Sequence, residues 1–584
     1  MLLRTIILVL SAASALSAAV PRGKPCPTTT TPPDGKITAT TKQRGNKVAV
    51  VGKVLNGAEL FGGIPFAQPP TGDLRWAHPL PAEYGAAVDA TQLGDICPQD
   101  LTYSAIAYNM SEDCLNLNVQ RPVGTSPKDK LPVLFWIYGG GFVGGNSAKY
   151  TSPYLVNYGA ATGRPFVLVT ANHRLGYLGW PYGDDFAKNN AGNLGLRDQI
   201  LALEWARDNI AGFGGDPKKV TVFGLSAGAI SVSIMMLDKK QKLFRGAIMQ
   251  SGPASATGVY RVDEAWQEPY DEFARLAGCA APVNTTRWAC LKALPGPQVW
   301  NASIAIHNNL TWMAPYFNAP SIDGEILPDH PYDLIKRGNV ANIPFISGTV
   351  ADEGTVFVFD PLIPKDENGT RQFIKGMFPH GLPDPLLDKI IKMYPNDPAV
   401  GSPFGTGNET FGEPPAWKQT TAIFGDMPFE SKRRWFHRSA NKHGNCNTWS
   451  YLWKTKNPTT PAMYGFAHAD DVSYMFGQVN VTANYTAEEV EVSEAIMNYW
   501  INFAYYLDPN GKDSRRRSNT FEPPPGVDHP NTTAVFPFWP VHSFPKNKDT
   551  LLFSPGNITI IQDDYREEQI DTFLLPEMIR PLGQ

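Results

Sequence analysis

The most informative stretch of the chain is Val220-Thr221-Val222-Phe223-Gly224-Leu225-Ser226-Ala227-Gly228-Ala229-Ile230-Ser231-Val232. An apolar, β-branched run ends in a Gly-x-Ser-x-Gly pentapeptide, and small, helix-compatible residues follow it. This order predicts a sharp turn from a strand into a helix, with Ser226 at its apex. Gly224 and Gly228 remove the side chains that would clash where the backbone passes closely. Ser226 Oγ would then stand clear of the sheet at a helix N-terminus, which stabilises developing negative charge.

Apolar runs typical of buried strands alternate with helical patterns on both sides of this stretch. We expect strands at residues 131–137, 165–171, 220–223, 246–251, 344–348 and 448–453. Residues 196–209 have the spacing of a helix. This alternation predicts an α/β fold with a large, mostly parallel sheet and helices on both faces. Reactive groups in such sheets lie beyond the carboxyl ends of the strands, where Ser226 is expected.

The chain has 584 residues, of which 42% are apolar, so one large α/β domain or two smaller ones can form. Its net charge of −4 gives no electrostatic case for binding nucleic acid. Residues 20–35 are rich in Thr and Pro and should form an extended arm. From residue 36 onward we find no second low-complexity linker and no internal repeat. We therefore predict one continuous domain over residues 36–584.

Residues 1–19 have the features of a secretory signal peptide. One positive charge at Arg4 precedes a short apolar run, and small residues near Ser17 and Ala19 place a cleavage site at about Ala19. This run is too short to span a bilayer comfortably, so a membrane anchor is the weaker alternative. No later stretch has about eighteen uninterrupted apolar residues, and residues 576–584 lack the hydrophobic tail of a lipid-anchor signal. We therefore expect a secreted protein.

Asn-x-Ser/Thr sequons and cysteines both fit secretion. The candidate glycosylation sites are Asn109, Asn284, Asn301, Asn309, Asn368, Asn408, Asn480, Asn484, Asn531 and Asn557. The cysteine spacing is not that of a zinc site, and we expect no metal. Two short-loop disulfides are indicated, Cys97/Cys114 and Cys279/Cys290, each constraining the unfolded chain by about 3 kcal/mol. The sequence leaves open whether Cys26 and Cys446 pair or stay free.

A serine hydroxyl is a weak nucleophile, so the chain should also supply a histidine and a carboxylate that holds it. Asp352 and Glu353 lie just past the expected strand at 344–348, after Thr349-Val350-Ala351, and position alone does not separate them. The alternative is that both are solvated loop acids.

Six histidines follow these acids: His380, His437, His443, His468, His529 and His542. His468 is the candidate base because it follows the strand at 448–453 and its small neighbours let the ring approach the serine. The alternative is an ordinary half-buried or surface histidine. His529 and His542 are weaker candidates because they lie near prolines in an expected surface stretch.

A glycine-rich stretch, Trp136-Ile137-Tyr138-Gly139-Gly140-Gly141-Phe142, follows another expected strand. Consecutive glycines let the backbone turn its N–H groups toward one point. Gly140 and Gly141, with Ala227 directly after the serine, would donate three N–H bonds to an oxyanion. A phosphate-binding loop is the rival interpretation. It fails because no Gly-Lys-Ser/Thr follows and the spacing is not Gly-x-Gly-x-x-Gly opening a helix.

Together these residues resemble the carboxylesterase/lipase type-B family, which includes cholinesterases and fungal lipases. The resemblance runs from about residue 36 to the C-terminal region and is carried by residues 63–70, 111–118, 136–142, 209–217 and 223–228. It implies an α/β-hydrolase fold with Ser226 as nucleophile, Glu353 as acid and His468 as base. It also implies an oxyanion hole formed by Gly140, Gly141 and Ala227. The implied disulfides are Cys97–Cys114 and Cys279–Cys290, and the implied buried ion pairs are Arg75–Glu112 and Arg174–Asp198.

The chain departs from the family pattern in three ways. Leu225 stands where many members have Glu, which argues against a second carboxylate beside the histidine and makes the pocket more apolar. The Cys97–Cys114 loop is shorter than the lid of family lipases, which argues against strong interfacial activation. This loop has Tyr103 and Tyr108 but no Trp, so a cholinesterase is not expected.

The sequence therefore predicts a secreted serine hydrolase of apolar carboxylic esters that works through an acyl-enzyme without metal or organic cofactor. One alternative is a lipase for triacylglycerols or sterol esters. Another is a catalytically silent binding or adhesion protein on the same scaffold. Silent relatives generally lose a triad residue, and none is missing here. The natural ester and the oligomeric state are not determined by the sequence.

Overall fold

The computed structural model describes residues 36–43, 46–100, 108–151, 153–263, 267–308, 319–378, 381–481, 485–512, 518–520 and 535–579. The predicted signal peptide and arm lie outside these residues. So do Cys26, Tyr103, Asn309, His380, Asn484, Asn531 and His529.

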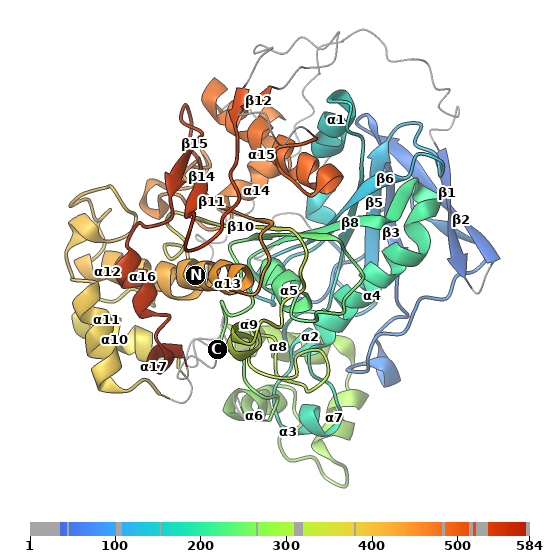
Figure 1. The fold of residues 1–584 in the computed structure, drawn as a ribbon. Coiled ribbons are helices and arrows are strands. Elements are labelled where there is room, and N and C mark those ends of the chain that lie inside the picture. Colours follow the sequence, from blue (N-terminus) through green and yellow to red (C-terminus); the bar gives the residue numbers. More distant parts are fainter. Residues whose placement is uncertain are drawn as a thin grey trace.

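In the described part of the chain, a 13-stranded sheet crosses the molecule (Figure 1). Its strands follow each other in space as β1 (Lys36–Gln43), β2 (Asn46–Leu55), β3 (Ala58–Pro65), β5 (Asn116–Pro122), β7 (Val167–Ala171), β6 (Leu131–Ile137), β8 (Gly215–Leu225), β9 (Gly246–Gln250), β10 (Phe345–Val350), β11 (Thr448–Trp453), β14 (Asp549–Phe553) and β15 (Thr559–Gln562). A short β4 (Ala87–Asp89) pairs with β2, and β12 (Ser518–Thr520) forms a separate two-stranded antiparallel sheet with β13 (Val535–Pro537).

Helices lie on both sides of this sheet (Figure 1). They are α1 (Pro153–Ala161), α2 (Gly176–Gly179), α3 (Asp184–Lys188), α4 (Leu194–Asn209), α5 (Ala227–Met235), α6 (Gln267–Leu276), α7 (Arg287–Ala293), α8 (Gly296–His307), α9 (Pro331–Lys336), α10 (Glu367–Gly376), α11 (Asp384–Met393), α12 (Pro415–Gly425), α13 (Ser431–Lys442), α14 (Asp470–Met475), α15 (Ala487–Tyr506), α16 (Glu567–Thr572) and α17 (Pro576–Ile579).

Every neighbouring pair of strands from β7 to β14 is parallel. These strands are apolar along most of their length because both faces are covered, as is usual in parallel sheets. Their carboxyl ends therefore share one edge of the sheet, and β8, β10 and β11 all end there. The α/β fold class predicted from the alternation of strands and helices is confirmed.

Apart from the short β4, which pairs parallel with β2, the margins of the sheet are antiparallel, and this was not predicted from the sequence. In β1 the side chains of Ile37, Ala39 and Thr41 are buried, whereas Lys36 is exposed. Such alternation is typical of a strand with one covered face, and it contains no continuous apolar run. A search for buried runs therefore passes over it.

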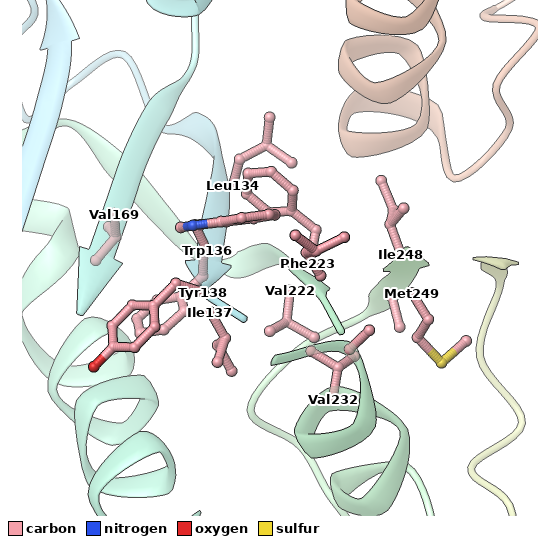
Figure 2. Close-up of a cluster of buried hydrophobic side chains, with 14 of the residues drawn as sticks. Leu134, Trp136, Ile137, Tyr138, Val169, Val222, Phe223, Val232, Ile248 and Met249 are labelled. Atoms are coloured by element: carbon pink, nitrogen blue, oxygen red, sulfur yellow. The ribbon is translucent and has the colours of Figure 1, made fainter. Parts of the chain in front are cut away.

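The core lies on both faces of the central strands (Figure 2). Trp136 of β6 and Phe223 of β8 pack together with ring centroids 4.8 Å apart, and Phe476 meets Trp136 edge-on at 5.2 Å. Figure 2 shows Val222 of β8 and Val232 of α5 on the other side of the sheet. Adjacent residues of β8 thus anchor opposite layers, which fixes where the strand ends and α5 begins.

The structure contains two disulfides, Cys97–Cys114 and Cys279–Cys290, as the family resemblance implies. The two implied ion pairs are also present and buried: Arg75 Nε lies 2.6 Å from Glu112, and Arg174 Nη2 lies 2.7 Å from Asp198. Arg75 also donates to the backbone carbonyls of Leu291, Lys292 and Leu294, just after Cys290. This guanidinium therefore ties the two disulfide loops together.

Six candidate glycosylation sites have exposed side chains: Asn109, Asn284, Asn301, Asn368, Asn408 and Asn557. Cys446 is exposed and has no disulfide partner among the described residues. Among the described helices, none has the length and hydrophobicity needed to cross a membrane. That residues 36–584 form one continuous domain stays a prediction.

Lys432 of α13 is a buried cation whose Nζ donates to the carbonyl of Phe573 at 3.1 Å. Burial lowers the pKa of its ammonium to about 7. The folded protein therefore carries an unfavourable buried charge below pH 7, and this penalty fades as pH rises from 7 toward the unfolded value near 10.5. We expect Lys432→Met to raise the free energy of unfolding by about 2 kcal/mol at pH 6, after the lost hydrogen bond is deducted.

Denaturant titrations at pH 6 and pH 9.5 test this expectation. The gain from Lys432→Met should shrink or reverse at the higher pH, where the wild-type amine is neutral. Lys442→Met, at the exposed end of the same helix, is the matched control and should change stability by less than about 0.5 kcal/mol. A loss of stability at pH 6 would show that the Lys432 ammonium is favourable where it lies.

Candidate active site

The predicted turn is present between β8 and α5, and we call residues 224–228 the elbow. Ser226 has φ 54° and ψ −126°, a conformation that only a well-supported turn maintains. A Cβ on Gly224 would lie 2.7 Å from the backbone of Gly228, and one on Gly228 would lie 2.1 Å from the Ile137 carbonyl oxygen. Both positions therefore require glycine. The Ser226 side chain is half-buried, and its N–H donates to the Gln250 carbonyl at 2.8 Å.

The glycine loop, residues 139–145, passes directly against the elbow. A Cβ on Gly139 would lie 2.9 Å from Cβ of Ser226. Gly140 and Gly141 have φ of 129° and 61°, and a Cβ on Gly140 would lie 2.2 Å from the Gly144 carbonyl oxygen. Their N–H groups donate to no acceptor in the described residues. Ala227 is the first residue of α5, so its N–H has no acceptor within the helix.

Glu353 and His468 are in direct contact. Glu353 lies in the turn after β10, and its Oε2 accepts a short hydrogen bond from His468 Nδ1, while its Oε1 accepts from the Val350 N–H at 2.9 Å. Both side chains are buried, Glu353 with 1% and His468 with 8% of its surface exposed. Both carboxylate oxygens are therefore used, and the orientation of the imidazole is fixed through Nδ1.

Asp352 takes a different part in the same turn. Its carboxylate accepts from the Ser402 hydroxyl and from the N–H groups of Phe404 and Phe466, at 2.8 to 3.0 Å. It also forms a parallel bridge with Ala467, the residue before His468. Asp352 therefore joins the loops that carry the acid and the histidine, and Glu353 is the carboxylate that touches the ring. This resolves the contact that the sequence left open between the two acids.

His468 and Ser226 are linked through neighbouring groups. His468 Nε2 is buried and makes no hydrogen bond to any described residue, so the structure shows no direct bond to Ser226. Asp471, three residues after His468, accepts from Gln250 Nε2 at 2.8 Å and from the Tyr451 hydroxyl at 2.9 Å. Gln250 in turn holds the Ser226 N–H through its carbonyl. This connection places the histidine loop next to the elbow.

Sequence reasoning missed Asp471. Burial raises the pKa of its carboxyl to about 6, and the bonds from Gln250 and Tyr451 oppose that rise. The Asp470-Asp471 pair, which begins two residues after His468, is the available signal, since two acids at the start of a helix favour its N-terminus.

The wall beside His468 is aromatic. The rings of Phe357 and Phe429 each have their centroid 5.0 Å from that of the imidazole. They belong to an apolar cluster that also contains Val358, Phe373, Trp417 and Phe424. Leu225, the residue before the serine, is buried as well, with 5% of its surface exposed. The surroundings of the candidate site are thus apolar, as the sequence predicts from Leu225.

The other described histidines that follow Asp352 and Glu353 contact other groups. His437 and His542 are buried together, with ring centroids 4.7 Å apart, and His443 at the end of α13 bonds the Ser439 carbonyl. Among the described residues, no cluster of three or more His, Cys, Asp and Glu side chains is arranged to hold a metal ion.

Comparison with known proteins identifies the family. The sequence model of the Carboxylesterase family matches residues 36–534. The chain belongs to the carboxylesterase family. It is therefore a carboxylic ester hydrolase, and the family resemblance carried by the motifs is confirmed.

Two fungal relatives match over most of their length. Secreted lipase 1 of Botryotinia fuckeliana is 37% identical over 497 residues, which cover 79% of this chain and 83% of the relative. Secreted triacylglycerol lipase LIP1 of Gibberella zeae is 33% identical over 604 residues, which cover 96% of each chain.

Two solved structures share the fold. EstA of Aspergillus niger superposes with a TM-score of 0.75 at 23% identity, covering 92% of this chain and 98% of its own. A structure named PNB esterase superposes with a TM-score of 0.69 at 26% identity, covering 91% and 99%. The α/β-hydrolase fold implied by the family resemblance is confirmed.

Proposed function

We propose that this carboxylesterase is a secreted serine hydrolase that cleaves apolar carboxylic esters through an acyl-enzyme. The observation that carries the proposal is the contact between Glu353 and His468, which orients the imidazole through Nδ1 and leaves Nε2 without a partner among the described residues. Ser226 lies on the neighbouring elbow, where the glycine loop passes its Cβ. In enzymes without substrate, the bond from serine to histidine is often longer than a hydrogen bond and tightens in the reacting complex.

The reaction follows from these roles. Ser226 Oγ attacks the ester carbonyl carbon while His468 Nε2 takes its proton, and Glu353 stabilises the imidazolium that forms. The N–H groups of Gly140, Gly141 and Ala227 receive the oxyanion, and each such donor is typically worth about 3 kcal/mol in the transition state. The alcohol leaves with the proton from His468. Water then attacks the acyl-enzyme by the same steps, so no metal or cofactor takes part.

An apolar substrate suits the surroundings of His468. Phe357, Phe429 and Leu225 offer hydrocarbon surface, which favours acyl or alcohol groups with few polar atoms. A lipase for water-insoluble esters is the second candidate, because the two fungal relatives above are named lipases. That the short Cys97–Cys114 loop gives little interfacial activation stays a prediction.

A chain-length series separates esterase from lipase. Rates are measured on p-nitrophenyl acetate, butyrate, octanoate and palmitate, below and above the solubility limit of each. An esterase is expected to prefer the soluble esters and to saturate below that limit. Preference for long chains with a jump in rate above the limit would identify a lipase.

Labelling with a fluorophosphonate probe tests whether the protein is catalytically silent. The probe reacts with an activated serine, so the wild-type protein should be labelled stoichiometrically and lose ester hydrolysis in parallel. An unlabelled wild-type protein that hydrolyses no ester would favour a binding or adhesion role.

Secretion is supported by the two disulfides, the six exposed sequons and the two relatives named secreted. Expressed with its own leader in a eukaryotic host, the chain should reach the medium with an N-terminus near Val20 and lose apparent mass on endoglycosidase treatment. Retention in the cell with an intact N-terminus would contradict this.

A further inference from the structure

We propose that Gln99 is a positioning residue that couples the Cys97–Cys114 loop to the glycine loop and so aims the Gly141 N–H. The inference rests on the proposed oxyanion role of the glycine loop. Gln99 touches neither the candidate nucleophile nor the candidate base, and no motif in the sequence singles it out.

Gln99 forms a paired amide contact with Gly145. Its Nε2 donates to the Gly145 carbonyl at 2.8 Å, and its Oε1 accepts from the Gly145 N–H at the same distance. The second Nε2 hydrogen points to the Cys97 carbonyl at 3.0 Å. The side chain is 2% exposed, so the amide uses both donors and its acceptor in a buried place. Removing this amide would leave the N–H and C=O of Gly145 unpaired.

Gly145 is coupled to the oxyanion donors through one tight turn. The N–H groups of Val143 and Gly144 donate to the Gly140 carbonyl at 3.1 and 3.0 Å, and a Cβ on Gly145 would lie 2.5 Å from the Gly139 carbonyl oxygen. The Gly140 carbonyl and the Gly141 N–H belong to one peptide plane and point in opposite directions. Holding that carbonyl on the inner side of the turn therefore aims the Gly141 N–H outward.

The backbone that carries Gln99 is held rigidly by the Cys97–Cys114 disulfide. Gln99 is two residues from Cys97, whose disulfide to Cys114 is fully buried. Its own N–H donates to Met110 Sδ at 3.3 Å, and Ile96 bonds the backbone on both sides of Met110. The Gln99 amide is therefore presented from a cross-linked base, and a displacement of that base would reach the glycine loop through Gly145.

The test compares Gln99→Glu with the wild-type protein. The substitution keeps the shape, and an ionised carboxylate still accepts from the Gly145 N–H. It cannot donate to the Gly145 and Cys97 carbonyls, and it repels both. Protonation restores one donor, and burial next to two carbonyls raises the pKa of such a carboxyl. The activity of the variant relative to wild type should therefore rise as pH falls.

We expect kcat on p-nitrophenyl butyrate to fall about 10- to 100-fold at pH 8 for Gln99→Glu, with KM changed less than about 3-fold. A trifluoromethyl ketone, which forms a tetrahedral adduct on the serine, should bind weaker by the same factor as kcat/KM falls. The matched methyl ketone, which stays trigonal, should bind as before. Gln99→Met, of similar length and uncharged, gives the same comparisons should the Glu variant not fold.

Asn445→Asp is the matched control. Asn445 is also a buried amide that bonds backbone, donating to the Ile343 carbonyl and accepting from the Asn447 N–H, but it lies where β10 and β11 begin, at the opposite edge of the sheet. Asn445→Asp should lower stability and leave kcat and the affinity ratio of the two ketones unchanged. A similar change in that ratio for both variants would show that Gln99 is merely structural.

The coupling is wrong if Gln99→Glu keeps the wild-type kcat, if its relative activity is independent of pH, or if the ratio of ketone affinities stays constant. These outcomes are distinct from failure of the proposed function. If the proposed function is wrong, the Ser226→Ala protein remains active. If only the coupling through Gln99 is wrong, the Ser226→Ala protein is inactive.

Discussion

Ser226→Ala is expected to lower kcat/KM for soluble p-nitrophenyl esters by about 10⁵-fold or more. Without the hydroxyl no acyl-enzyme forms, and the residual rate comes from the glycine loop and the pocket acting on water. The fold should persist, because the Ser226 side chain is half-buried and the turn is held by backbone contacts with Gln250, Gly224 and Gly228. Initial rates and thermal melts of the purified variant check both statements.

Ser231→Ala is the control for this result. Ser231 lies in the same helix, α5, and its buried hydroxyl has no hydrogen-bond partner among the described residues. Loss of this hydroxyl should change kcat/KM by less than about 3-fold, since it makes no hydrogen bond to any of the proposed groups. A Ser226→Ala protein that retains more than about 1% of the wild-type rate would exclude Ser226 as the nucleophile.

Glu353→Gln carries the second large effect, a fall in kcat of about 10³- to 10⁴-fold. Glu353 uses both oxygens, one for His468 Nδ1 and one for the Val350 N–H, but a glutamine has only one acceptor oxygen. When that oxygen keeps the Val350 bond, the NH₂ group faces Nδ1 and favours the tautomer with its proton on Nε2. That tautomer cannot take the serine proton, so the base is lost while the ring stays in place.

Asp352→Asn makes the comparison specific, because Asp352 is adjacent, buried and accepts three hydrogen bonds without touching His468. We expect it to lower thermal stability and to reduce kcat by no more than about 10-fold. Measurements of kcat and thermal melting curves for both variants test these expectations. If instead Asp352→Asn loses activity at unchanged stability and Glu353→Gln keeps its activity, Glu353 is not the acid.

Whether a strand can be predicted from the sequence depends on whether one or both of its faces are buried. Residues 131–137 and 448–453 were predicted with the bounds that β6 and β11 have, because strands covered on both faces are continuous apolar runs. Residues 36–43 gave no such run, because β1 belongs to an antiparallel margin of the sheet and its side chains alternate between core and solvent. A search for alternation with period two would have found β1.

The residues of the candidate site also differ in whether the sequence predicts them. Ser226 and the glycine loop are visible in sequence because their geometry demands glycine at fixed spacing. The choice between Asp352 and Glu353 is not visible in the local pattern, and only the family resemblance implied Glu353. In the structure Asp352 bridges to Ala467, and Glu353 meets the histidine. Gln99 was not visible either, because its partner Gly145 is 46 residues away and is recognised through backbone atoms.

In the proposed reaction an acyl group is bound covalently to Ser226. The direct measurement is mass spectrometry of protein mixed with excess p-nitrophenyl butyrate and quenched in acid within milliseconds. Wild-type protein is expected to gain the mass of one butyryl group, which peptide sequencing should place on Ser226. Ser226→Ala should gain none. An acyl group on another residue, or rapid turnover with no adduct at any quench time and no labelling of Ser226 by fluorophosphonate, would contradict it.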